Sequence, residues 1–256
     1  MITDIYNDNS YIEKNPTLHT EDSEFKFQNI KKFLSSVKVK NNRIKILDIG
    51  GGAGIIGKLV LDYFLENGIV VTFHSLDLST RMLKIQLKNN PQINKIINCS
   101  IDECPESNYD LVLMIDVIEH IEGKEYTAKI LNKLGKNIIY NIPIEINFFD
   151  VIKFLKSNFR YYKSQKERWG HIHFFSFTSS QSFLRRHHKI IDSYFQPYCF
   201  HYKYSDYESY LKLRHDFFWN IELNISCWIF NNFPKISKYL IQGSNYSLVK
   251  TKNNLS

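Results

Sequence analysis

The stretch Asp48-Ile-Gly-Gly-Gly-Ala-Gly54 decides the fold of this chain. It overlaps the end of a short apolar run, Ile44 to Ile49, that is typical of a buried parallel strand. A stripe of apolar residues at helical spacing follows from Ile55 to Phe64, and Gly68 stands where a helix would end. A strand, a glycine loop and a helix in this order indicate a unit whose loop lets a ligand approach the backbone.

The rest of the chain repeats this alternation of strands and helices. It predicts an α/β fold with a doubly wound, Rossmann-like, seven-stranded sheet, mostly parallel with an antiparallel last strand. A helical insert rich in aromatic residues is expected before that last strand. The predicted strands cover residues 44–49, 69–76, 95–99, 109–115, 137–140, 189–200 and 245–251, and the predicted helices residues 27–37, 55–64, 79–90, 123–134, 147–157, 178–188 and parts of 205–240.

The length and composition fit one domain with additions. Of the 256 residues 43% are hydrophobic and 15% aromatic, which is ample for a core. We expect residues 1–256 to form a single domain, with an N-terminal lid or helix over 1–40, a cofactor-binding core over 41–145 and substrate-side elements over 146–256. The formal net charge of +7 fits either solvated helix faces or an anionic substrate or partner, such as a phosphorylated sugar, a nucleic acid or a membrane surface.

Cysteine usage and hydropathy predict the compartment. The four cysteines form no C-x-x-C pair, which favours buried thiols in a reducing compartment over a disulfide framework or a zinc site. The N-terminus is polar and acidic and so predicts no signal peptide. The apolar stretch from Phe217 to Phe230 is too short and too polar to span a bilayer. We therefore expect a cytoplasmic protein without a transmembrane segment.

Two cofactor templates overlap on the glycine loop. Gly52-Ala-Gly54-Ile-Ile-Gly57 fits the G-x-G-x-x-G pattern of a dinucleotide site, and Asp48 to Gly54 fits the D-x-G-x-G-x-G loop of S-adenosylmethionine (SAM) enzymes. A carboxylate at Asp48 would repel a pyrophosphate, whereas it favours the ammonium and sulfonium of SAM. Asp77, at the end of the second strand, could accept both ribose hydroxyls of either cofactor. The loop therefore favours SAM.

Four motifs in order make the chain resemble the class I SAM-dependent methyltransferases, within the broad group of ubiquinone-biosynthesis-type and small-molecule or sugar methyltransferases. They are the Asp48–Gly54 loop, Leu76-Asp-Leu-Ser79, Tyr109-Asp-Leu-Val-Leu113 and Asp116-Val-Ile-Glu-His-Ile121. The stretch from Lys14 to Ser23 extends the resemblance upstream. The resemblance and the loop together predict these cofactor contacts: Asp48, Gly50, Gly51, Gly52, Gly54, Asp77, Leu78, Ser100, Ile101, Asp102, Asp116 and Val117.

One predicted contact departs from the common pattern of this group. Many relatives place an aspartate after the third strand, where it accepts a hydrogen bond from the adenine amino group. Ser100 stands at that position here and Asp102 follows two residues later. Either Asp102 takes the role, or Ser100 and backbone groups do.

Glu119 and His120 follow the fourth strand and would face the sulfonium. Methyl transfer needs the acceptor atom aligned with the methyl group, and a hydroxyl acceptor must also lose a proton. His120 could deprotonate or orient that hydroxyl, or it could pack beneath the sheet. Glu119 could orient His120, bind substrate or a divalent ion, or serve as an acid at a helix N-terminus. We take both as candidate catalytic residues.

Candidate substrate contacts lie upstream and downstream of this core. Trp169-Gly-His-Ile-His-Phe-Phe175 would place His171 and His173 on one face of a strand over the acceptor site. A metal at this pair would need a third ligand that the sequence does not identify, so no metal site is predicted. His19 and Tyr6 are candidates for a lid.

We predict a SAM-dependent methyltransferase that carries out O- or C-methylation of a small-molecule or sugar-type acceptor. A methyltransferase for RNA, another nucleic acid or protein is one alternative. However, an Asn/Asp-Pro-Pro-aromatic motif is missing after the fourth strand and no RNA-binding appendage is legible. A non-catalytic SAM-fold interaction protein is a second alternative, and a dinucleotide oxidoreductase a third. The insert over 205–240 could cap the pocket, form a homodimer contact or dock on a membrane surface.

Overall fold

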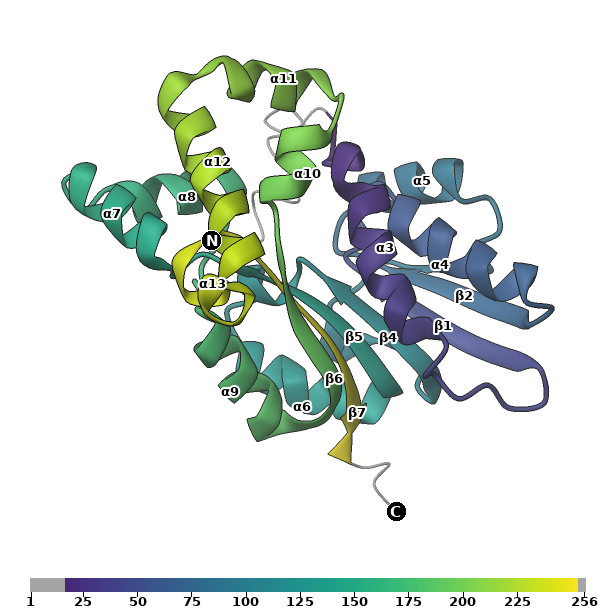
Figure 1. Ribbon diagram of the computed structural model, residues 1–256. Coiled ribbons are helices and arrows are strands. Elements are labelled where there is room, and N and C mark those ends of the chain that lie inside the picture. Colours follow the sequence, from purple (N-terminus) through teal and green to yellow (C-terminus); the bar gives the residue numbers. More distant parts are fainter. Residues whose placement is uncertain (1–16, 253–256) are drawn as a thin grey trace.

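The computed structural model describes residues 17–252, which are built around one seven-stranded sheet (Figure 1). The strand order is β3-β2-β1-β4-β5-β7-β6. Neighbouring strands pair in parallel from β3 to β5, whereas β7 runs antiparallel to both β5 and β6. The strands are β1 (Arg43–Ile49), β2 (Val70–Leu76), β3 (Lys95–Ile97), β4 (Tyr109–Ile115), β5 (Gly135–Ile144), β6 (His188–Pro197) and β7 (Gly243–Thr251).

This topology confirms the predicted fold class, including the antiparallel last strand. The order reverses between β1 and β4, so the carboxyl ends of these two strands diverge and leave a crevice for a ligand. β5 is longer than predicted: it begins at Gly135, directly after a helix, and extends through Pro143. Its pairing with β7, from Asn137 to Ile144, accounts for this length.

Helices cover both faces of the sheet. On one face, α3 (Ser23–Leu34) and α4 (Ile55–Glu66) pack Ile30, Phe33 and Val60 against the strands. On the other face, α6 (Lys124–Leu134) and α9 (Phe177–His187) bury Leu131 and Leu184. α5 (Thr80–Asn89) lies beside β2 and β3, and Ser79 caps it by accepting a hydrogen bond from the Met82 amide at 3.3 Å.

The remaining helices form a cap at one end of the sheet (Figure 1). The cap has a small core of its own around Leu223, Cys227 and Ile241. Three of its helices, α11 to α13, fall within the predicted insert. The cap consists of α7 (Phe148–Lys156), α8 (Tyr161–Trp169), α10 (Cys199–Tyr204), α11 (Glu208–His215), α12 (Phe217–Asn232) and α13 (Pro234–Leu240). Among residues 17–252, no helix is long and apolar enough to cross a membrane.

Two local expectations need correction. The basic stretch before Trp169 forms the helix α8, which was not predicted. The segment from Gly170 to Phe174, predicted as part of a strand, has no regular structure, and only Phe175 forms a bridge, to Ile144. The strand that this segment approaches, β5, already pairs with β4 on one side and β7 on the other, so it offers no free edge.

Candidate functional site

The glycine loop turns tightly between β1 and α4, and the packing around it explains two of its glycines. Gly54 caps α4 with a φ of 79°, and a Cβ there would come within 2.9 Å of the Gln86 backbone in α5. A Cβ on Gly51 would collide with the carboxylate of Asp48, which lies directly beneath the loop. Side chains at these positions would push the loop outward and into the space of a ligand.

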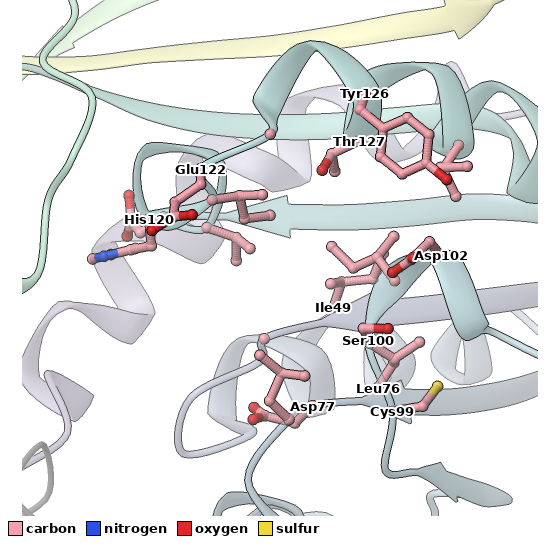
Figure 2. Close-up of a pocket in the computed structure, with 18 of the residues that line it drawn as sticks. Ile49, Leu76, Asp77, Cys99, Ser100, Asp102, His120, Glu122, Tyr126 and Thr127 are labelled. Atoms are coloured by element: carbon pink, nitrogen blue, oxygen red, sulfur yellow. The ribbon is translucent and has the colours of Figure 1, made fainter. Parts of the chain in front are cut away.

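The loop borders a cavity of about 430 Å³ at the carboxyl ends of β1, β2 and β4. Figure 2 shows Asp77 and Ser100 on one wall of this pocket, Tyr126 and Thr127 on the opposite wall, and His120 at one end. The lining residues are Ile49, Gly50, Gly52, Leu76, Asp77, Leu78, Met82, Cys99, Ser100, Ile101, Asp102, Asp116, Val117, His120, Ile121, Glu122, Gly123, Tyr126, Thr127 and Ile130.

Most of the predicted cofactor contacts lie on this lining. Nine of the twelve do so, namely Gly50, Gly52, Asp77, Leu78, Ser100, Ile101, Asp102, Asp116 and Val117. Asp48, Gly51 and Gly54 do not line the cavity, and the Asp48 carboxylate lies beneath the loop. The influence of Asp48 on a ligand would therefore pass through the loop instead of through direct contact. Of the two candidate catalytic residues, His120 lines the pocket and Glu119 does not.

Asp48 is almost fully buried, with 3% of its surface exposed. Burial, and secondly the charge of Asp77, raise its pKa to about 7. A carboxyl group in this state gains from any cation that binds nearby, since the cation stabilises its ionised form. The sequence argument that the loop favours a cationic ligand is compatible with this environment.

Asp77 is held in a fixed orientation at the end of β2. One carboxylate oxygen accepts a hydrogen bond from the Ser79 amide at 2.9 Å, and the other accepts from the Gln86 side chain at 3.2 Å. Burial outweighs these bonds and raises the pKa of Asp77 to about 6. Each carboxylate oxygen keeps a second lone pair, so the group can accept two hydrogen bonds from a vicinal diol.

The wall beyond β3 carries the candidates for adenine recognition. Both Ser100 and Asp102 line the pocket. The Ser100 hydroxyl donates to Glu103 at 2.9 Å, whereas Asp102 has an exposed side chain directed towards the pocket in Figure 2. This arrangement favours Asp102 over the Ser100 hydroxyl as the acceptor for an amino group. Tyr126 and Thr127 from α6 complete this part of the pocket.

Asp116 lies at the switch point of the sheet in a strained backbone conformation, with a φ of 54°. Its carboxylate accepts a hydrogen bond from Asn141 at 2.7 Å and forms an ion pair of 2.8 Å with Lys26. Asn141 belongs to β5 and Lys26 to α3, so the N-terminal helix and the sheet together fix this side chain. An acidic group held here suits the ammonium end of a ligand in the pocket.

Glu119 and His120 follow Asp116 on a short 3-10 helix. Glu119 is fully buried, and burial together with the charge of Asp116 raises its pKa well above the usual range. Burial and the adjacent His171 lower the pKa of His120 to about 3. The nearest carboxylate oxygen of Glu119 and Nε2 of His120 are 3.9 Å apart. The His120 imidazole is therefore neutral near pH 7 and can accept a hydrogen bond through a ring nitrogen.

His171 and His173 occupy two different environments, which corrects their predicted place on one strand face. The ring of His171 lies 4.8 Å from that of His120, and its Nδ1 is 2.8 Å from a Glu145 carboxylate oxygen. His173 turns towards Lys124 and the carbonyl of Ile121. Within residues 17–252, Glu119, His120 and His171 each offer one ligand atom within 4.8 Å of the others, an arrangement that could hold a metal ion.

The N-terminal segment reaches this same region. The His19 ring lies 5.1 Å from that of Trp169, just before His171. Asp22, in the turn before α3, accepts hydrogen bonds from Tyr210 and from His201, whose Nε2 is 2.9 Å away. The start of α3 is thus tied to the cap. Tyr6, the other candidate for a lid, lies outside the described residues.

Several side chains of the site were not identified from the sequence. Lys26 reaches it from α3, Asn141 from β5, and Glu145 from the position directly after β5. Of these three, only Glu145 could have been found from the sequence. It follows β5 at the carboxyl edge of the sheet, where the other candidate site residues also lie. Nothing in the local pattern around Lys26 distinguishes it from the lysines on the outer side of α3.

Comparison with known proteins finds one family model that matches the core of the chain. Residues 47–138 match the model of a family described as methyltransferase domain. No curated protein matches the chain.

Solved structures with the same fold include several enzymes. A candidate sarcosine dimethylglycine methyltransferase from Galdieria sulphuraria has a TM-score of 0.57 at 16% identity, over 89% of this chain and 84% of that one. A cyclopropane synthase from Mycobacterium tuberculosis has a TM-score of 0.56 at 10% identity, and the match covers 88% of this chain and 83% of that one. Phosphoethanolamine N-methyltransferase 2 from Haemonchus contortus, in complex with SAM, has a TM-score of 0.52 at 17% identity. That match covers 88% of this chain and 52% of that one.

Proposed function

We propose that this chain is a class I SAM-dependent methyltransferase and that it transfers the methyl group of SAM to an oxygen or carbon atom of a small, sugar-type acceptor. The position of His120 carries the proposal. Its neutral imidazole lies at the end of the cofactor pocket near Asp116, and beside the polar side chains of His171 and Glu145. A base at that place suits acceptor atoms that lose a proton, namely hydroxyl oxygens and acidic carbons.

The lining supports one orientation of the cofactor. Asp77 would accept the ribose hydroxyls, and Asp102 would accept from the adenine amino group. Gly50, Gly52 and Asp116 would then receive the methionine end, which carries the ammonium. His120 would then lie at the methionine end of the cofactor, because both His120 and Asp116 line the pocket and both lie next to Glu119.

The reaction needs little more from the protein than alignment and removal of one proton. The SAM sulfonium supplies an electrophilic methyl group when bound. His120 would accept a hydrogen bond from the acceptor hydroxyl and hold its oxygen in line with that group. As the oxygen takes up the methyl group, the acceptor hydroxyl would pass its proton to a ring nitrogen of His120. The imidazole would then release the proton to solvent.

The charges around His120 favour a hydroxylated small molecule over a nucleic acid. Glu145 and Asp116 both lie close to this end of the pocket. Carboxylates suit hydroxyl groups as hydrogen-bond partners, but they repel a chain of phosphates. Two lysines also lie in this region: Lys26 pairs with Asp116, and Lys124 contacts His173. They could bind a single anionic group on the acceptor.

Formation of S-adenosylhomocysteine tests the proposal directly. The full chain is incubated with SAM and, in separate reactions, with free sugars, nucleotide sugars, phenols, RNA or unfolded protein. Mass spectrometry then detects S-adenosylhomocysteine and the methylated acceptor. We expect turnover with a hydroxylated small molecule. Turnover with RNA or protein alone would contradict the proposed acceptor class, and tight SAM binding without any turnover would favour the non-catalytic alternative.

Thermal unfolding distinguishes the two cofactors that fit the glycine loop. We expect S-adenosylhomocysteine to raise the Tm by several degrees at a concentration far above its Kd, because it binds only the folded chain. NAD⁺ and NADH should leave the Tm unchanged, since Asp48 and Asp116 disfavour a pyrophosphate. A larger shift with NAD⁺ than with S-adenosylhomocysteine would contradict the assigned cofactor.

A further inference from the structure

The helical cap, defined here as residues 146–169 and 199–240, exposes an unusual amount of aromatic surface. Every Phe or Trp side chain that residues 17–252 expose lies on it, and Phe217 and Phe218 are 71% and 80% exposed. Apolar patches of this kind on a folded domain mark contact surfaces. The exposed Phe and Trp residues are Phe148, Phe159, Phe217, Phe218, Trp228 and Phe233.

Helix α12 is apolar on two opposite sides. Its inner side buries Leu223 and Cys227 in the core of the cap. Its outer side exposes Phe218, Ile221, Ile225 and Trp228, which recur at spacings of three and four residues and so form one stripe. Apolar stripes of this size are typical of contact surfaces, and nothing in residues 17–252 covers this one.

Helix α7, which lies beside α12, also carries a stripe of exposed apolar side chains. Phe148, Val151 and Leu155 are each more than 40% exposed and share one side of the helix. An ion pair of 2.6 Å between Lys153 and Glu222 joins α7 to α12, and α13 contacts both helices. The two exposed stripes therefore belong to one packed unit and not to separate mobile segments.

Cations accompany this apolar surface. Residues 151–169 contain six Lys and Arg residues and one acid, Glu167. Within residues 17–252, Lys156, Arg160, Lys166 and Lys235 have exposed side chains and no carboxylate within 4.0 Å. Exposed aromatic side chains next to basic ones are what a protein needs to bind an anionic lipid surface, where the rings enter the headgroup region and the cations meet the phosphates.

We propose that the cap docks on the surface of a membrane that contains anionic lipids, without crossing it. A second copy of the chain fits this surface less well. A twofold contact brings the same patch of both copies together, so the unpaired cations would face each other. Protein interfaces are also depleted in lysine at their centre. The proposal is independent of the methyl acceptor, since no residue of the exposed stripes lines the cofactor pocket.

Flotation with lipid vesicles tests this proposal on the full chain. We expect the chain to float with vesicles containing phosphatidylglycerol, to float much less with pure phosphatidylcholine, and to be released by high salt. The double variant Phe217→Ser/Phe218→Ser and the double variant Lys156→Glu/Arg160→Glu should each weaken binding at least tenfold. These side chains are exposed, so the fold should persist, and unchanged binding of S-adenosylhomocysteine confirms this for each variant.

The matched control is Leu87→Ser/Lys88→Glu, which changes an exposed apolar residue and an exposed lysine on α5, outside the cap. This control should bind vesicles as the parent chain does. Equal loss of binding in the control and the cap variants would overturn the proposal, as would failure of the parent chain to bind anionic vesicles. A dimer in sedimentation that is lost in Phe217→Ser/Phe218→Ser, without vesicle binding, would assign the surface to a second copy instead.

Discussion

Replacing His120 with alanine is expected to lower kcat by about 10²- to 10⁴-fold, the usual contribution of a positioned acid or base. The variant removes the only imidazole among residues 17–252 that lines the cofactor pocket, while the glycine loop and Asp77 stay unchanged. The Kd for SAM should therefore change little. Single-turnover kinetics with a hydroxyl acceptor, combined with calorimetry for SAM, separates the two effects.

A matched control uses the other histidine of the same segment. His173→Ala removes an imidazole that contacts Lys124 and the Ile121 carbonyl outside the pocket lining, so we expect a much smaller effect on kcat. The pH profile gives a second check. With a pKa of about 3, His120 stays neutral between pH 5 and 8, so its protonation should not reduce the rate in that range. If His120→Ala kept full turnover and the same profile, the base would have to be another group.

Replacing Asp77 with alanine is expected to weaken SAM binding by about 30- to 100-fold, the loss of two hydrogen bonds to one carboxylate. Asp77→Asn keeps the acceptor for the Ser79 amide but loses the charge and one acceptor, and should fall between the parent and the alanine variant. Calorimetry with SAM and with S-adenosylhomocysteine measures both. Unchanged affinity in Asp77→Ala would refute the ribose role.

The same side chain predicts how binding depends on pH. Burial raises the pKa of Asp77 to about 6, so the carboxyl group is ionised above that pH and protonated below it. Only the ionised group can accept from both ribose hydroxyls. SAM affinity should therefore fall as the pH drops from 7 to 5, and Asp77→Asn should lose the step near pH 6. A step of equal size in the variant would assign the titration to Asp48, with a pKa of about 7.

The sequence by itself determined the fold class and the cofactor region. The βα alternation and the loop from Asp48 to Gly54 predict the sheet, since short apolar runs that alternate with amphipathic helices favour buried parallel strands. The carboxyl ends of parallel strands meet at one edge, so motifs that end β1, β2 and β4 had to lie near each other. Local pattern therefore sufficed to bring Asp77, Asp116 and His120 to one pocket.

The tertiary structure alone decided what surrounds these residues. Whether Asp48 touches the ligand or lies behind the loop depends on the packing of Gly51 and Gly57 over it. The ion pair between Lys26 and Asp116, and the contact of His171 with Glu145, join elements far apart in the chain. A contact of this kind leaves no periodic trace in the sequence, because it depends on how separate elements pack. The exposure of the aromatic cap also depends on this packing. The sequence showed that the segment is rich in aromatic residues, but not which of them form exposed stripes.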